Sequence, residues 1–286
     1  MSEKLVLGPL LSLENDNKYV VCFLSKTNQN YFVQFNEQKI KAFMLGNLKT
    51  GFLYRAECII EKETFNQKVT YNIQTKDNEL VLDKNNRDSW NFIVPANDRD
   101  SRFSYNSYEN LMDSKLLEKE LESPHDLLIL NEFILLDEDV YKKLNRIDDI
   151  NRRSLDGFFE DLYIQKWNDK NISLALASIP NIIMKQEHEL LLNEFHDEIN
   201  YLEDINHSCK KYFEIFQLRT IKNNTLLTKD RSHYSFALKL GNNQILAVDD
   251  SCPKNQSDII SKYLISKDSS DKLFILCDSN TKAQSL

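Results

Sequence analysis

The sequence lacks any apolar run that approaches the ~20 residues needed to cross a bilayer. Its first residues, from Met1 to Leu7, also lack the longer apolar core of a secretory signal. An excess of positive charge is absent too, because the 286-residue chain has a formal net charge of −8. These absences argue against a membrane span and against general nucleic-acid binding, and they predict a cytoplasmic protein.

Paired cysteines are missing as well. The five cysteines are odd in number, widely scattered and without a C-x-x-C pair, which excludes a disulfide framework. Cys22 and Cys277 lie in apolar, strand-like runs, so we expect reduced, mostly buried thiols. A nucleophilic cysteine would need a nearby base and an electropositive setting. Hydrophobic residues make up 41% of the chain, which is enough for one large domain or two ordinary ones.

The organisation of the chain predicts two domains. Residues 5–82 consist of short alternating or apolar runs separated by Asn-, Lys- and Asp-rich turns, which is typical of an all-β domain. After a polar linker at residues 83–88, strands alternate with helical patterns, as in an α/β layer fold. We therefore predict a two-domain protein of the α+β or α/β class, with an N-terminal β-sandwich over residues 1–88 and a second domain over residues 89–286. The expected helices span residues 108–121, 137–144, 154–167, 185–202, 209–216 and 257–265.

Two segments of the second domain share one design. Each is an apolar, strand-like run, at residues 127–130 and 179–184, and each is followed by polar residues. Open α/β sheets place their ligand sites at the carboxyl ends of such strands. The two segments are therefore the first place to look for a functional site.

The first segment resembles a motif of the PhoD-like alkaline phosphatase and phosphodiesterase family, whose members are metallophosphoesterases. In that family the strand ends in Gly-Asp-x-x-Tyr-x-Asp. Here Asn131 and Glu132 stand in place of the Gly and the metal-bridging Asp, and Leu135 stands in place of the metal-binding Tyr. Asp137 matches the last acid of the motif.

The second segment is similar to the family motif Trp-Asp-Asp-His-Asp/Glu. Lys185 replaces the Trp, and Gln186 and Glu187 replace the two Asp residues. Only His188 and Glu189 are kept in kind. The resemblance thus makes Glu132, Asp137, Glu187, His188 and Glu189 the residual ligand positions of a degenerate site.

The resemblance extends over most of the chain. Further similar segments lie at residues 8–10, 48–54, 90–95, 102–107, 158–167 and 212–217. It implies a fibronectin-III-like β-sandwich followed by a metallophosphoesterase-type α/β layered domain. The Gly-Asp-x-His segment that supplies the remaining metal ligands in the family does not occur in this sequence, so the resemblance predicts a C-terminally shortened member.

The replaced residues are poor ligands for a binuclear hydrolytic centre, which holds two cations about 3.5–4 Å apart. Glu132 adds a methylene that displaces its carboxylate, and Leu135 cannot coordinate a metal. Gln186 is neutral, and Lys185 adds positive charge. We therefore expect no catalytic residue, no bound metal and no other cofactor, and we expect an inactive protein that acts as a protein-interaction or assembly component.

Two alternatives stay open. In one, the chain is a weak single-metal phosphatase or phosphodiesterase that uses Glu132, Glu187 and His188 with manganese, iron, zinc or calcium. In the other, a partner chain or a homo-oligomer completes the site in trans. The shortened domain also predicts a protein partner or self-association, because an uncovered strand edge is usually covered by another chain.

The residual positions also fit plainer explanations. The acidic residues between 187 and 205 could bind a metal, but the residues one turn from each histidine are apolar or amide side chains, which favours a solvated acidic helix face. His188 could simply satisfy local hydrogen bonds. Asp137 and the two acids after it fit the first turn of a helix, where carboxylates oppose the positive end of the helix dipole.

Overall fold

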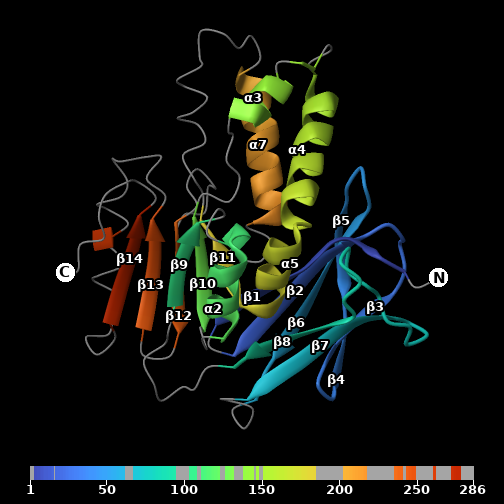
Figure 1. Cartoon of the computed structure of the whole chain (residues 1–286), viewed down its shortest axis with the longest axis vertical. Coiled ribbons are helices and arrows are strands. Elements are labelled where there is room, and N and C mark those ends of the chain that lie inside the picture. Colours follow the sequence, from blue (N-terminus) through green and yellow to red (C-terminus); the bar gives the residue numbers. More distant parts are fainter. Residues whose placement is uncertain are drawn as a thin grey trace.

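The computed structural model describes residues 3–15, 17–61, 67–94, 103–107, 111–122, 126–131, 138–144, 146–147, 151–184, 202–217, 235–240, 243–248, 260–261 and 272–277. Within these residues the protein combines a strand-rich N-terminal region with smaller sheets and a group of helices (Figure 1). The fold class is α+β. In the described part of the chain, no helix has both the length and the apolar character that a membrane crossing requires.

The N-terminal region consists of two four-stranded antiparallel sheets. The first sheet has the order β1 (Leu5–Asn15), β2 (Lys18–Ser25), β6 (Phe52–Ile59), β5 (Phe43–Asn47). The second has the order β4 (Gln38–Lys41), β3 (Tyr31–Phe35), β7 (Lys68–Thr75), β8 (Ser89–Ile93). The strand-rich N-terminal region that the sequence predicts is therefore confirmed.

Alternating residues hold the two sheets together. In β7 the side chains of Val69, Tyr71 and Ile73 are buried, whereas the residues between them are more exposed, as expected for a strand with one face on a core. Aromatic rings join the sheets, since the ring centroids of Tyr19 and Phe92 lie 4.7 Å apart. This interior is a face-to-face sandwich core rich in aromatic side chains.

The C-terminal region contains two three-stranded sheets and the helices that the structure describes. Three parallel strands form one sheet, in the order β11 (Asn181–Ile183), β10 (Leu127–Asn131), β9 (Phe103–Ser107). The other sheet is mixed, in the order β12 (Phe236–Leu240), β13 (Asn243–Val248), β14 (Lys272–Cys277). The helices are α2 (Ser114–Glu122), α3 (Glu138–Leu144), α4 (Arg152–Trp167), α5 (Lys170–Ser178) and α7 (Leu202–Phe216).

The β9–β11 sheet lies between two layers. Leu127 and Ile129 of β10 join the core that contains the sandwich interior and residues of β12 and β13. Leu128 and Leu130, which point to the opposite face, join a second core formed with α4, α5 and α7. Because both faces are covered, β10 reads as a continuous apolar run, which is how the sequence predicted it.

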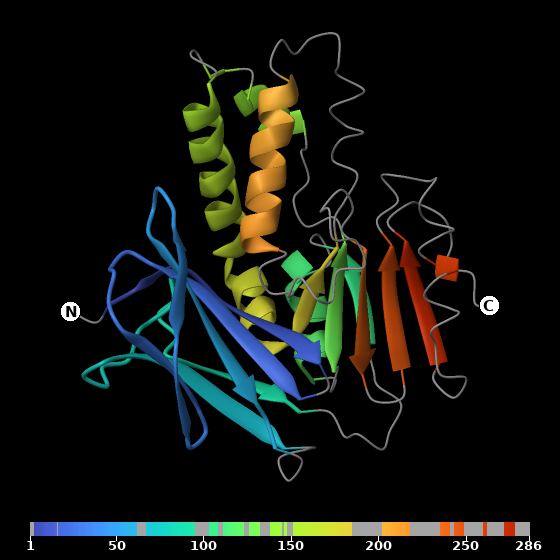
Figure 2. The same cartoon turned by 180° about the vertical axis from the view of Figure 1, so that it is seen from behind.

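The helices α4 and α7 lie side by side in both views (Figures 1 and 2). They run in the same direction, because Asp156 near the start of α4 accepts a hydrogen bond from Ser208 (2.9 Å), while Tyr163 farther along packs against Phe216. The start of α4 is fixed by Asn151, whose side chain accepts from two backbone N–H groups of the first turn. The expected helix at residues 154–167 is thus present, two residues longer at its start.

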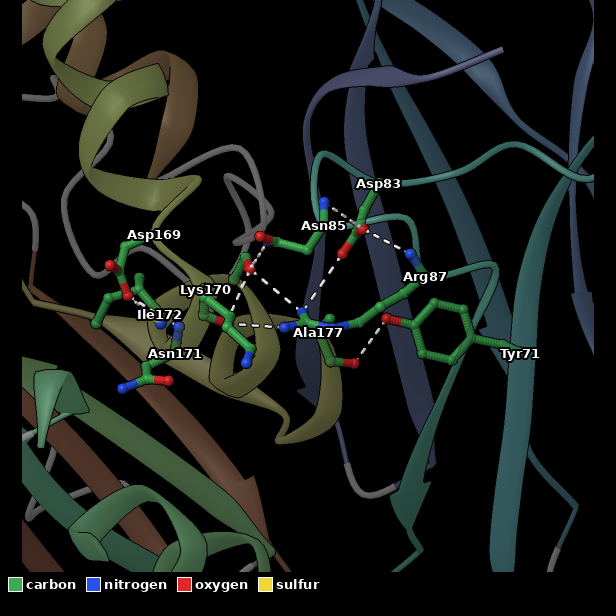
Figure 3. Close-up of polar contacts among 10 residues, drawn as sticks. Tyr71, Asp83, Asn85, Arg87, Asp169, Lys170, Asn171, Ile172 and Ala177 are labelled. Atoms are coloured by element: carbon green, nitrogen blue, oxygen red, sulfur yellow. Dashed lines mark hydrogen bonds and ion pairs between the residues drawn. The ribbon is translucent and has the colours of Figure 1, made fainter. Parts of the chain in front are cut away.

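The segment that the sequence predicts as a polar linker forms an ordered turn against α5 (Figure 3). The Asp83 carboxylate accepts from the backbone N–H groups of Asn85 (2.7 Å) and Arg87 (2.8 Å). Arg87 in turn donates to the Lys170 carbonyl oxygen (2.9 Å), and Asn85 donates to the Ser173 hydroxyl (2.9 Å). We call these five residues the α5 joint.

The strand β8 follows this joint and pairs with β7. Residues 89–93 therefore belong to the second sheet of the sandwich, on the far side of the boundary predicted at residue 88. Tyr71, next to Trp90 in the register, also reaches across to the helices, since its hydroxyl donates to the Ala177 carbonyl oxygen (2.7 Å; Figure 3). The division into residues 1–88 and 89–286 stays a prediction.

Candidate functional site

The two polar segments singled out in the sequence leave the fold from neighbouring strands. In the parallel register, Leu128 lies opposite Asn181 and Leu130 lies opposite Ile183. The backbone N–H of Met184 donates to the Leu130 carbonyl oxygen (2.9 Å), so the pairing continues to the last described residue of the second segment. The carboxyl ends of β10 and β11 therefore meet at one edge of the sheet, which is where ligand sites form in parallel sheets.

The strand β9 ends at the same edge, with Ser107 opposite Asn131. The site residues themselves, Glu132, Asp137, Glu187, His188 and Glu189, lie outside the described residues. The same holds for the replaced positions, Leu135, Lys185 and Gln186. The structure thus brings together the strands that carry both motifs, and the roles of the motif residues stay predictions.

A buried amide fixes the start of β11. Asn181 is 3% exposed, and its Nδ2 donates to the carbonyl oxygens of Leu11 (2.7 Å), Leu176 (3.0 Å) and Ile179 (3.0 Å). These contacts join β11 to β1 of the sandwich and to the end of α5. The sequence offered one signal for this role, because a buried polar residue inside an apolar strand needs hydrogen-bond partners.

The described residues include His, Cys, Asp and Glu side chains, which are common metal ligands. Among them, no three His, Cys, Asp or Glu side chains lie close enough together to hold a metal ion. The residual ligand candidates are not part of that set.

The cysteine prediction holds for the thiols described in detail. Cys22 and Cys58 are buried thiols, and Cys209 is a partly exposed one. Burial raises the pKa of the Cys58 thiol to about 12, so this thiol stays protonated at neutral pH. A protonated, buried thiol is a poor nucleophile.

A second polar feature was not predicted from the sequence. Glu160 of α4 is fully buried, and its carboxylate accepts from the backbone N–H groups of Lys49 (3.1 Å) and Thr50 (2.7 Å). The Thr50 hydroxyl (2.5 Å) and the Tyr212 hydroxyl (3.1 Å) donate to it as well. Burial, and then the Glu160 charge, raise the pKa of Tyr212 above its ordinary value. We call these four residues the α4 joint.

A groove of about 740 Å³ opens beside this joint. It lies between the turn that follows β5 and the helices α4 and α7. Its described lining includes the basic residues Lys49, Arg153 and Lys211 and the apolar residues Leu53 and Ile215. We call this feature the α4 groove.

Comparisons with known proteins identify no family. No family model matches the chain, and no curated protein matches it. A solved structure of the type III pullulan hydrolase from Thermococcus kodakarensis is similar over 70% of this chain and 45% of that enzyme, with 10% identity and a TM-score of 0.24. At that identity and TM-score the similarity carries no argument about fold or reaction.

Proposed function

We propose that this chain is a degenerate PhoD-like scaffold that no longer hydrolyses phosphoric esters and acts as a protein-interaction or assembly component. The observation that supports it most is the parallel pairing of β10 with β11, which starts both motif segments at one sheet edge. A metallophosphoesterase-type domain requires that arrangement, because its metal ligands come from several strand ends. The residues at those ends are then the reason for the lost activity.

The N-terminal part of the proposal is a fibronectin-III-like sandwich. Its strand orders, β1-β2-β6-β5 and β4-β3-β7-β8, correspond to the A-B-E-D and C′-C-F-G orders of Greek-key sandwiches of the immunoglobulin type. This supports the sandwich as a module placed before the layered domain. Modules of this type commonly present surfaces to other proteins, but fold alone does not decide function.

The chemical argument depends on three replacements. Leu135 has no ligand atom, Gln186 has no charge to offset a cation, and Lys185 repels one. A site with these residues has too few anionic oxygen ligands for two divalent ions. We therefore propose that the edge has become a surface for a protein partner or for a second copy of the chain.

A metal-dependent hydrolase is the second candidate. It is favoured by the imidazole that is kept in kind and by two acids that stand in place of motif Asp residues, since Glu132, Glu187 and His188 could together hold one divalent ion. This site would be either weakly active alone or completed in trans by a partner chain. The same sheet edge would serve both candidates.

Metal content and hydrolysis of bis(p-nitrophenyl) phosphate, measured on one preparation, separate the candidates. The purified chain is incubated with manganese, iron, zinc or calcium, and bound metal is counted by elemental mass spectrometry. We expect well below one equivalent and no turnover above buffer. One tightly bound ion together with turnover that His188→Ala abolishes would overturn the proposal in favour of the hydrolase.

A variant with restored ligands tests the scaffold itself. Glu132→Asp, Leu135→Tyr, Gln186→Asp and Glu187→Asp are combined, and an exposed substitution on α2, Glu118→Asp, serves as the control. We expect the restored variant to bind more metal than the natural sequence and the control to match it. Unchanged metal content in the restored variant would argue against a metallophosphoesterase-type edge.

A further inference from the structure

The α4 groove gathers positive charge on an acidic protein. The chain has a net charge of −8, yet the described lining of the groove has three basic side chains and one acidic one, Asp156. Asp156 pairs with Lys211, and Lys49 lies 3.8 Å from the exposed carboxylate of Asp161, just outside the lining, so Arg153 is the basic side chain of the lining for which no ion pair is described. A concave site in which one sign of charge predominates raises the local concentration of ions of the opposite sign. The groove is therefore suited to an anion that the rest of the surface repels.

Contacts with α4 and spacing along it place the three cations over the same two turns of this helix. The Lys49 ammonium lies 2.9 Å from the position that a Cβ on Gly157 would take. The Lys211 ammonium bonds the carboxylate of Asp156, the residue before Gly157. Arg153 lies four residues before Gly157, so it occupies the same helix face.

The lining of the groove also has an apolar part. Leu53, Tyr212 and Ile215 line it, and each of the three is at most 9% exposed. A volume of about 740 Å³ falls within the range of small-molecule sites, which combine an apolar lining with a few polar groups that orient the ligand. The arrangement fits a molecule with an apolar body and a charged end.

We infer that the α4 groove binds a small organic anion, with its apolar body against Leu53 and Ile215 and its carboxylate or phosphate against Arg153, Lys211 and Lys49. This inference does not depend on the proposed function. Among the described lining residues, none comes from β9, β10 or β11. Whether or not the sheet edge at the carboxyl ends of β10 and β11 binds a metal, the residues that line the α4 groove stay the same.

Isothermal titration calorimetry with four probes tests the inference. Octanoate and phenyl phosphate carry an apolar body, whereas acetate and inorganic phosphate present the same charged groups without one. We expect saturable binding of octanoate, phenyl phosphate or both, and at least about tenfold weaker binding of the probe without the body, because burial of apolar surface contributes to affinity. Binding of octanoate alone assigns a carboxylate, and binding of phenyl phosphate alone assigns a phosphate. No saturable binding of either overturns the inference.

Two charge variants locate the site. Arg153→Gln and Lys211→Gln should each weaken binding by about tenfold, because each removes a charge-assisted contact. Lys41→Gln, an exposed lysine on β4, is the matched control and should bind like the natural protein. Equal affinity in all three variants would show that the probe binds elsewhere and would overturn the inference.

Gly157→Ala removes the possibility that weaker binding reflects a damaged fold. The variant keeps every charge, but its Cβ would stand 2.9 Å from the Lys49 ammonium and must displace it. Alanine favours a helix more than glycine does, so the fold should become more stable. We expect weaker binding together with a higher melting temperature. Unchanged binding would exclude Lys49 from the site.

Discussion

Among the polar contacts between the sandwich and the helices, the α5 joint and the α4 joint differ in how their charges are compensated. At the α5 joint, the sandwich contributes both the cation of Arg87 and the carboxylate of Asp83, which lie 3.4 Å apart. At the α4 joint, the donors that the described residues give to the buried carboxylate of Glu160 are all neutral, namely two backbone N–H groups and two hydroxyl groups. The first joint neutralises itself, whereas the second depends on every donor being in place.

This difference indicates which of the two joints should lose more unfolding free energy when one of its side chains is removed. A buried anion without a counter-ion is stable only while its hydrogen bonds are complete, and its removal leaves several buried donors without an acceptor. The ion pair between Arg87 and Asp83 lies within one turn of the sandwich. Less unfolding free energy should therefore be lost when the contacts of this turn to the helices are removed. The α4 joint should therefore dominate the stability of the interface.

The largest effect is expected for Glu160→Ala, at about 3–5 kcal/mol of unfolding free energy. The substitution leaves the Tyr212 hydroxyl and the Lys49 and Thr50 N–H groups without their acceptor. Urea denaturation followed by circular dichroism measures it. The matched control is Asp161→Ala on the next residue, whose side chain is 63% exposed and which should change stability by less than about 0.5 kcal/mol. If Asp161→Ala lowered the unfolding free energy as much as Glu160→Ala does, the buried and the exposed carboxylate would not differ in their contribution to stability, contrary to this prediction.

An intermediate effect is expected for Arg87→Ala, at about 1–3 kcal/mol. It removes the bonds to Lys170 and Ser173 and leaves Asp83 with its two backbone donors. The same denaturation experiment applies. Arg152→Ala is the control, because that arginine pairs with Asp204 on the surface and should contribute little. If Arg87→Ala cost more than Glu160→Ala, the ranking of the two joints would be wrong.

The smallest effect is expected for Tyr212→Phe, at about 1 kcal/mol near neutral pH, since one donor of the four is lost. The same variant should alter the response to alkali. The folded state raises the pKa of Tyr212 above the unfolded value of about 10, so the folded chain keeps the phenol proton while the unfolded chain loses it. This contribution is fully present below pH ~10 and is lost as the pH rises above it.

Unfolding free energies measured from pH 8 to 11 check this sign. The natural protein should lose stability above pH ~10, and Tyr212→Phe should lose less over the same interval. Tyr71 and Tyr163 also have raised pKa values because they are buried. In Tyr212→Phe the decrease of unfolding free energy with rising pH should therefore become smaller without disappearing. An unchanged slope in the variant would contradict the raised pKa of Tyr212.

Much of the local structure could be predicted from the sequence where a pattern extends over enough residues. The apolar runs that became β10 and β14 and the periodic stretch that became α4 were placed correctly. The helix α5 was missed because it is short and mostly apolar, so it has no polar face that would separate it from a strand. The helix α7 starts at Leu202, seven residues before the predicted start.

The contacts between distant residues could not be predicted. The sequence does not distinguish Glu160 from other helix acids, and its donors at Lys49 and Thr50 lie 111 and 110 residues away in the chain. A sequence pattern carries no information on such partners, because only the packing of the layers brings them together. At the candidate site the sequence predicted the strands, the structure paired them, and the motif residues beyond Asn131 and Met184 stay predictions.

The bond from Asn181 to the Leu11 carbonyl oxygen joins residues 170 positions apart. During synthesis the sandwich emerges from the ribosome long before β11 has been made. The contact of β1 with Asn181 can therefore form only after β11 has been synthesised. Contacts between residues so distant in sequence slow the search for the native topology, because a long loop must close before the contact forms. The candidate edge should therefore be among the last parts of the protein to assemble, and a ribosome-bound chain that ends before residue 181 should show a formed sandwich and no edge.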